Sequence, residues 1–251
     1  MSQGSCRVMQ RLLEVAGGPQ RDEMVRRLIP WTVQLYESPH GNHVLTRLVE
    51  VTPCTSLVPV VEQIQERGCM TVAKHQFGCR VLERLIEHCT EREMGGLNSR
   101  FVHSAEELCR HRYGNFVIQS LLEHGPSHRG AQVVQRLLPY LPQLAAHRTA
   151  SHVVQTALVY AGGEGQRAIV AALLGGASPR AFLDIAASRY GGYVVEDLQK
   201  LRYPNIDTEI RRRLMCAGPE HLASPHFHRV LEHYGLRSPA PVVEGTSCLD
   251  Q

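Results

Sequence analysis

Six short triplets recur along the chain, and each sets a flat side chain between two that can reach the edge of a flat ligand. A small or amide residue comes first, Arg, His, Phe or Tyr follows it directly, and Gln, Thr or Glu stands three residues later. Polar side chains one helical turn apart could grip the edge of an unpaired nucleobase, while the flat group stacks on its face. The triplets are Cys6, Arg7 and Gln10; Asn42, His43 and Thr46; Cys79, Arg80 and Glu83; Asn115, Phe116 and Gln119; Ser151, His152 and Gln155; and Gly192, Tyr193 and Glu196.

The triplets are evenly spaced, with first residues 36, 37, 36, 36 and 41 positions apart. A period this regular is typical of a solenoid, whose units are too small to bury their own apolar faces and must stack. Apolar residues also recur at helical spacing on the side away from each triplet, such as Val117, Leu121 and Leu122 after Asn115. The sequence therefore predicts stacked amphipathic helices that bring the six triplets to one surface.

Apolar helical segments lie between the triplets, for example residues 23–29, 57–64, 132–138 and 168–174. Gly-Gly, Gly-Pro and Thr-Pro pairs separate them as turn signals. Each unit is expected to contain two longer helices and a short leading one. The extra residues of the longest interval are expected in a loop at 175–179. No segment alternates apolar and polar residues long enough to indicate a sheet, so the predicted fold class is all-α.

Two segments resemble repeats of the Pumilio (PUF) RNA-binding proteins. Residues 77–89 read FGCRVLERLIEHC and residues 113–125 read YGNFVIQSLLEHG, and the likeness extends from about residue 2 to about residue 234. The resemblance implies a right-handed α-solenoid, a crescent of three-helix repeats with a period of about 36 residues. Its concave face would bind single-stranded RNA antiparallel to the protein, one base per repeat.

The resemblance also implies a cellular role. It suggests a cytoplasmic post-transcriptional regulator that binds the 3′ untranslated regions of messages. Protein effectors bound to the convex face would repress translation or shorten poly(A) tails. We expect the chain to act as a monomer.

The outer members of each triplet indicate a preferred base. A carboxylate accepts hydrogen bonds only, so Glu83 and Glu196 suit guanine, whose edge offers two donors. Asn115 with Gln119 can match the alternating groups of uracil. A small residue beside a glutamine suits adenine, as at Cys6 with Gln10 and at Ser151 with Gln155. In the PUF family these pairings of side chains are associated with the same bases.

The second triplet departs from the family pattern. Asn42 is paired with Thr46 where Gln is usual, so the assignment of uracil there has less support than at Asn115 and Gln119. Read antiparallel, the six triplets predict 5′-GAUGUA-3′, which contains the UGUA core typical of the family. The family usually reads that core with its C-terminal repeats, whereas here it falls on the first four triplets, which leaves the order and flanking bases open.

Both ends depart from the repeat. The first triplet begins so early that its helix would lack a covering helix, and we expect upstream repeats to be missing. Near the C-terminus, His228, Arg229 and Glu232 can be aligned as a seventh triplet, although a register shifted by three residues fits nearly as well. We expect a degenerate capping repeat, a repeat domain at 1–236 and a disordered tail at 237–251.

Composition limits the functional classes. The net charge is only +3, so stacking and base-edge contacts would have to carry much of the affinity for RNA. No apolar run has membrane-spanning length, and the first residues do not form a signal peptide. The eight cysteines contain no Cys-x-x-Cys pair, which argues against zinc and for a reducing compartment. We expect no metal and no cofactor.

Three other functions remain open. An armadillo-like or HEAT-like scaffold for protein partners would share the period, but it would not need a flat group between edge-matching residues in every unit. A non-specific RNA-binding relative acting in ribosome assembly would share the fold, with eroded triplets and a more basic face. Catalysis has the least support, because no nucleophile motif, metal-ligand spacing or phosphate-binding glycine loop is present.

Overall fold

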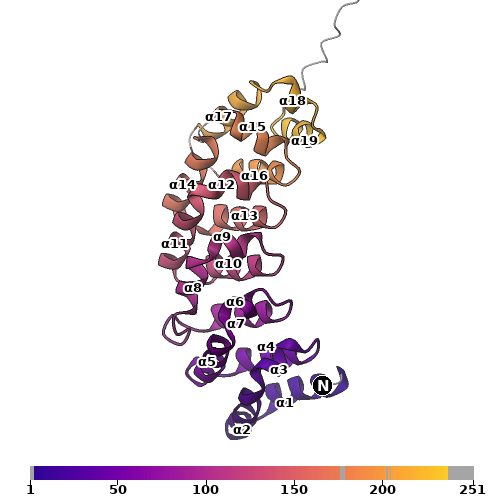
Figure 1. Cartoon of the computed structure of the whole chain (residues 1–251), viewed down its shortest axis with the longest axis vertical. Helices are drawn as coiled ribbons and strands as arrows, with labels where there is room; N and C mark the ends of the chain where they lie inside the picture. Colours follow the sequence, from indigo (N-terminus) through magenta and orange to yellow (C-terminus); the bar gives the residue numbers. More distant parts are fainter. Residues whose placement is uncertain (1–2, 176–178, 202, 204, 237–251) are drawn as a thin grey trace, which may run out of the picture.

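The helices form one curved stack with an inner and an outer row (Figure 1). The computed structural model describes residues 3–175, 179–201, 203 and 205–236. Within these residues the regular structure is helical and no strand occurs. The predicted all-α solenoid is confirmed.

The helices that carry the triplets stack in sequence order along the inner side of the curve, each packed on the next (Figure 1). A capping helix, α19, continues the row after the sixth. The amphipathic stripe explains this stacking, because residues such as Val117 and Leu121 are fully buried between neighbouring helices. The row consists of α1 (Gln3–Val15), α4 (Gly41–Val51), α7 (Gly78–His88), α10 (Gly114–Glu123), α13 (Ala150–Tyr160), α16 (Gly191–Leu198) and α19 (Pro225–His233).

A second row lies along the outer side of the curve (Figure 1). It consists of α2 (Gly18–Leu28), α5 (Val58–Arg67), α8 (Leu97–His103), α11 (Ser127–Leu137), α14 (Gly162–Leu174) and α17 (Ile206–Leu214). The four apolar segments predicted between triplets fall on helices of this row or on the short helical turns that adjoin them, as expected.

Further helices lie between the two rows along the chain. They are η1 (Ile29–Trp31), α3 (Thr32–Glu37), η2 (Cys54–Leu57), α6 (Cys69–Ala73), α9 (Ala105–Arg110), η3 (Leu138–Tyr140), α12 (Leu141–Ala145), α15 (Pro179–Ala187) and α18 (Pro219–Leu222). The units from α4 to α13 thus have a short helix before the triplet helix, as expected, whereas the leading helix α15 of the sixth unit has nine residues and the triplet helix α16 has eight. The loop expected at 175–179 is bounded by the end of α14 and the start of α15, and residues 176–178 lie outside the described part.

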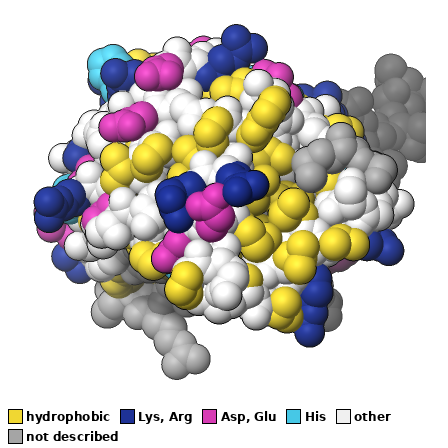
Figure 2. Space-filling view, turned by 90° about the horizontal axis from the view of Figure 1, so that it is seen from below, with side chains coloured by type: hydrophobic (Ala, Val, Ile, Leu, Met, Phe, Trp, Pro, Cys, Tyr) yellow, Lys and Arg dark blue, Asp and Glu magenta, His cyan; other side chains and the backbone are white. Residues whose placement is uncertain are grey.

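The N-terminal end of the row exposes apolar side chains. Val8 is 60% and Leu12 is 45% exposed, whereas Leu13 is fully buried and Met9 packs partly against the core. The expectation that the first triplet helix lacks cover is therefore right for Val8 and Leu12 and wrong for Leu13. Figure 2 views this end and shows apolar side chains gathered around a group of charged ones.

Two further observations concern the described residues as a whole. None of their helices is both long and apolar enough to cross a bilayer. Nor do three or more of their His, Cys, Asp and Glu side chains group together in a way that could hold a metal ion. The tail from residue 237 lies outside the described part.

Candidate nucleic-acid interface

All six triplets occupy the same place in their units. In the five units from α4 to α16 the triplet begins at the second residue of the helix, so its first and third members are one turn apart on one face. The first residue is buried in every unit, the third is half-buried, and the flat residue is exposed except at Phe116, which is half-buried. The structure therefore brings the predicted residues together as a row of repeated sites.

The turn before each of the five triplet helices from α4 to α16 is held by a side chain that the sequence analysis missed. Four residues before the first triplet residue stands His or Ser, whose ring nitrogen or hydroxyl accepts a hydrogen bond from the first N–H of the helix. This arrangement satisfies a backbone donor that helices leave unpaired at their N-termini. The acceptors and distances are Ser38 to Gly41, 3.0 Å; His75 to Gly78, 3.1 Å; His111 to Gly114, 3.1 Å; His147 to Ala150, 3.3 Å; and Ser188 to Gly191, 3.0 Å.

Two of these histidines are held neutral. Burial lowers the pKa of His111, and the nearby charges of Lys74 and Arg112 lower it further, against a weaker opposite effect of Glu107. Burial and Arg110 likewise lower the pKa of His147. A neutral ring keeps the acceptor lone pair that the turn requires.

The buried asparagine of the fourth triplet is tied to the backbone. The Asn115 side chain donates to the carbonyls of His111 and Arg112 at 2.9 and 3.0 Å, and its Oδ1 accepts from Gln119 at 2.8 Å. Asn42 donates to two carbonyls of its own turn in the same way. The amide therefore has a fixed orientation, and in the fourth triplet it orients the glutamine one turn above.

Glutamines at the third position also contact the next unit. Thr156 Oγ1 donates to Gln119 Oε1 at 3.2 Å, and Gln155 Nε2 donates to Asp197 Oδ2 at 2.6 Å. The partner in each case follows the third triplet residue of the next unit by one position. In the first two units the third residue stays local, because Gln10 and Thr46 donate to backbone carbonyls of their own helices.

The third triplet contains an internal ion pair. Arg80 donates to both carboxylate oxygens of Glu83, at 3.2 and 2.9 Å, and its guanidinium lies 4.4 Å from the centroid of the Phe116 ring. Burial raises the pKa of Glu83, although Arg80 acts in the opposite direction. Burial also raises the pKa of the Cys79 thiol to about 11, so this position presents a neutral group at neutral pH.

The seventh motif provides one side chain to this surface. Arg229 of α19 pairs with Glu196 and covers the ring of Tyr193, so it stands next to the sixth triplet. His228 is half-buried and Glu232 is exposed. Of the three residues aligned as a seventh triplet, the structure brings Arg229 to the row.

A hollow lies between the fourth and fifth triplets. Its volume is about 410 Å³. The third residue of one unit and the flat residue of the next both line it. The lining residues are Arg112, Asn115, Phe116, Gln119, Arg148, Thr149, His152 and Tyr190.

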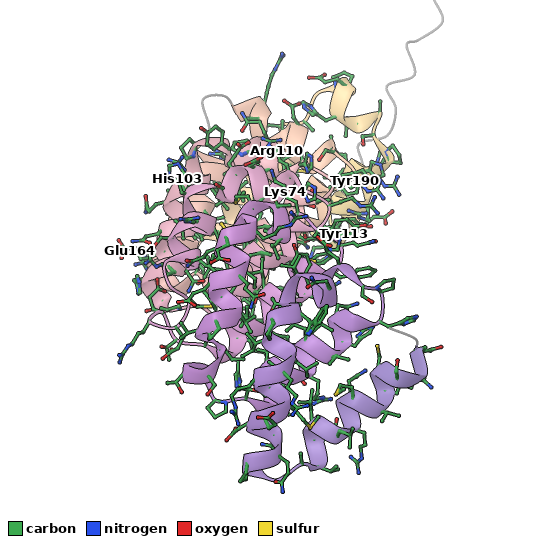
Figure 3. The ribbon with its side chains drawn as sticks, turned by 60° about the horizontal axis from the view of Figure 1, so that its bottom comes forward. Lys74, His103, Arg110, Tyr113, Glu164 and Tyr190 are labelled. Carbon is green, nitrogen blue, oxygen red and sulfur yellow. The ribbon has the colours of Figure 1, made fainter. Side chains whose placement is uncertain are left out.

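Three arginines beside this surface were also missed by the sequence analysis. Arg112, Arg148 and Arg189 are exposed, and each precedes the first residue of its triplet by three positions. That constant offset in units four to six is the signal that could have identified them. Figure 3 shows Tyr113 and Tyr190, from the same turns, on one side of the molecule and His103 and Glu164, from the outer helices, on the other.

Comparisons with known proteins follow the repeat. A family model described as the Pumilio-family RNA binding repeat matches residues 1–29, 68–94, 105–138 and 140–174. Among curated proteins, Pumilio homology domain family member 4 of Saccharomyces cerevisiae is 28% identical over 85 residues. That stretch is 34% of this chain and 10% of the relative.

Solved structures agree along most of the chain. The structure of PUF-8 in complex with PBE-RNA has a TM-score of 0.81 and 23% identity, and the match covers 92% of this chain and 68% of that one. The Puf4 RNA binding domain bound to an HO endonuclease RNA 3′ UTR recognition sequence has a TM-score of 0.80 and 22% identity, with 92% and 72% covered. The Puf3 RNA binding domain bound to the Cox17 RNA 3′ UTR recognition sequence site A has a TM-score of 0.79 and 20% identity, and the match covers 91% of this chain and 70% of that one. At these identities the likeness shows a shared fold.

Proposed function

Because the chain belongs to the Pumilio (PUF) family of RNA-binding repeat proteins, we propose that it binds single-stranded RNA along its row of triplets, one base to each. The observation that carries this proposal is the identical placement of the triplets on consecutive packed helices. Each offers a flat side chain, exposed in every triplet but the fourth, and a polar side chain a turn above it. The family consists of RNA-binding repeats and not of enzymes.

The surface has the two kinds of contact that unpaired RNA requires. The flat residues provide stacking platforms, which bind any base, and the third residues provide donors and acceptors that distinguish bases. The hollow between the fourth and fifth triplets supports a base position there, between Phe116 and His152. Arg112, Arg148 and Arg189 would meet phosphates, which adds affinity without sequence preference.

The preferred sequence is proposed to be 5′-GAUGUA-3′, with UGUA as its core. Glu83 would read the guanine of the core, and Asn115 with Gln119 would read the uracil before it. A base must replace the hydrogen bonds that these side chains make within the protein, so its own hydrogen bonds have to match them closely.

The proposed cellular role is regulation of messages in the cytoplasm through sites in their 3′ untranslated regions. Its support is family membership and the fold shared with Puf3 and Puf4 domains bound to 3′ UTR recognition sequences. Effector proteins would bind the outer helices, which the RNA leaves free. A reporter message that carries the site should be translated less or decay faster when this protein is tethered to it or overexpressed than when it is absent. An unaffected reporter would remove the regulatory part of the proposal.

A fluorescence titration tests the binding itself. We expect at least about tenfold tighter binding of a UGUA-containing RNA than of a scrambled RNA, if each matched base contact contributes the roughly 1–3 kcal/mol of discrimination found for duplex DNA. His152→Ala should weaken binding. Tyr140→Ala removes an exposed ring outside the triplets and should not. Equal affinity for both RNAs would favour the non-specific alternative, and no binding of either would favour a protein scaffold.

A further inference from the structure

One side chain of the capping helix α19 occupies the sixth triplet. Arg229 Nε donates to Glu196 Oε1 at 2.7 Å, and the guanidinium carbon lies 3.8 Å from the centroid of the Tyr193 ring. A guanine in this triplet would be expected to stack on Tyr193 and donate its N–H groups to Glu196. The guanidinium is also planar and a donor, so it makes both of the contacts that guanine would make.

The glycine of the sixth triplet provides the space for this group. A Cβ at Gly192 would lie 2.8 Å from Arg229 Nη2, closer than the two atoms could approach. The other five triplets carry Cys, Asn or Ser at this position, and a side chain there would displace the guanidinium. The sixth triplet is therefore the one whose composition admits an arginine from the next unit.

The occupying group is held incompletely. Arg229 Nη2 is buried and finds no hydrogen-bond partner among the described residues. A buried donor without a partner costs free energy that is recovered when the group returns to water. The ion pair and the stacking contact favour the state in which Arg229 lies in the sixth triplet. The unpaired donor raises the free energy of that state, so less is needed to move Arg229 out.

The third triplet offers a contrast. Arg80 also pairs with a carboxylate that is proposed to read guanine, but both side chains belong to the same triplet and Arg80 is itself the stacking residue. In the sixth triplet the cation comes from another unit and covers the stacking residue as well as the carboxylate. Arg80 also lies over Phe116 of the fourth triplet, but it leaves Gln119 of that triplet to other partners. Among the described residues, the sixth triplet is the one in which a single side chain from another unit contacts both the stacking ring and the edge-reading carboxylate.

We propose that Arg229 is an internal ligand of the sixth triplet, and that a guanine is read there only when Arg229 has moved out. This inference rests on the proposed function. A competitor that fills a site lowers the apparent affinity of every base for it. An RNA held by the other five triplets can therefore bind with its 5′-most base left outside the sixth triplet, where the identity of that base has no effect. Discrimination at the 5′-most base should consequently be weak in the native protein, while discrimination within the UGUA core is unaffected.

The test compares GAUGUA, AAUGUA and a scrambled RNA on the full chain. In the native protein the first two RNAs should bind within about twofold of each other. Arg229→Met keeps the aliphatic stem and removes the donors, and should raise the preference for GAUGUA to at least about fivefold, as expected for an accessible base contact. Arg212→Met removes an exposed arginine of the outer row and serves as the charge-matched control, with no change expected.

A second variant opens the site from the other side. Gly192→Ser introduces the side chain that the fifth triplet already carries at Ser151, and should displace Arg229 and raise the same preference. Strong discrimination in the native protein that Arg229→Met abolishes would overturn the inference, because Arg229 would then be positioning Glu196. An unchanged preference in both variants would overturn it as well.

The two proposals fail in different ways. If none of the proteins prefers UGUA to the scrambled RNA, the proposed function is wrong, and so is the inference about guanine in the sixth triplet. If the core preference holds but the 5′ preference does not respond to Arg229→Met, only this inference is wrong. In the free protein, arginine side-chain NMR should show slower exchange of the Arg229 Nε proton than of the Nε proton of Arg136, which is exposed on an outer helix. Equal exchange of the two protons would exclude the internal ligand without any RNA.

Discussion

At the scale of single residues, the triplets are already hydrogen-bonded before any RNA binds. Glu83 is paired with Arg80, Gln119 bonds to Asn115 and Thr156, and Gln155 bonds to Asp197. Selectivity therefore depends on how well a base replaces these partners. The chemical type of the third residue decides this, because a carboxylate accepts only and an amide both donates and accepts.

Glu83→Gln is expected to change the preferred central base. It would give the third triplet the Cys, Arg and Gln combination that Cys6, Arg7 and Gln10 form in the first. Binding of UGUA RNA should weaken and binding of UAUA RNA should strengthen, because adenine offers an acceptor beside its amine. The ratio of the two affinities should move at least about fivefold, if base contacts here are worth the roughly 1–3 kcal/mol found for duplex DNA.

Glu196→Gln is the matched control for that substitution. The same chemical change in the sixth triplet should leave the central base preference as it was. Titrations of both variants against the same two RNAs supply the comparison. If both substitutions altered the same nucleotide preference, or neither altered any, the reading of one base per repeat would be wrong for this chain.

At the scale of the element, the turns before the triplet helices depend on neutral acceptors. His111→Ala should lower the free energy of unfolding by about 1 kcal/mol, the usual cost of losing a helix N-terminal acceptor. His111→Ser should lose less, because a hydroxyl serves at Ser38 and Ser188. Urea unfolding of the two variants measures the difference. Equal losses would show that the acceptor is not what the turn requires.

Acid should weaken the same turns. The pKa values of His111 and His147 are lowered in the folded chain, so the unfolded chain takes up protons first as the pH falls below about 6.5. The contribution of the two neutral histidines to the free energy of unfolding is therefore fully present above that pH. It decreases as the pH falls toward their lower pKa values in the folded chain. A double variant, His111→Ser with His147→Ser, should lose less stability between about pH 7 and pH 5 than the native protein.

The turns also carry arginines that the proposed RNA path would meet. Replacing Arg112 and Arg148 by Gln should weaken binding of every RNA by a similar factor. It should also reduce the slope of log affinity against log salt by about 1.4, the value for two contacts to single-stranded phosphates. Arg100→Gln with Arg136→Gln removes two exposed arginines from outer helices and is the control. A changed base preference would mean that these arginines contact bases.

Much of this was predictable from the sequence. The period fixed the stacking of the units, and the apolar stripe fixed which side of each helix is buried, because every unit solves the same packing problem. The His or Ser before each turn was missed because two different residue types fill one role. Contacts between units, such as Arg229 with Glu196 or Gln155 with Asp197, join residues 33 and 42 positions apart and depend on side-chain conformations that periodicity does not determine.

At the scale of the whole molecule, stability should differ between the end and the middle of the row. Helix α10 is packed between α7 and α13, whereas α1 packs on α4 and leaves Val8 and Leu12 exposed. Each apolar side chain left uncovered forgoes up to roughly 1.5–3 kcal/mol. Amide hydrogen exchange of the isolated monomer should therefore be faster at residues 5–15 than at residues 115–125. Equal protection of the two segments would contradict this expectation.

The hydrogen bonds that Thr156 donates to Gln119 and that Gln155 donates to Asp197 connect consecutive units as well as orienting individual side chains. A nucleotide that hydrogen-bonds to Gln119 or Gln155 must break the hydrogen bond between units. Binding there replaces existing hydrogen bonds and adds few new ones. The heat released per bound base at these two positions should then be smaller than at the first two triplets, where Gln10 and Thr46 bond within their own helices. Calorimetry of progressively shortened RNAs would show binding enthalpy distributed unevenly along the strand, with the cost of loosening the scaffold concentrated toward the 5′ end.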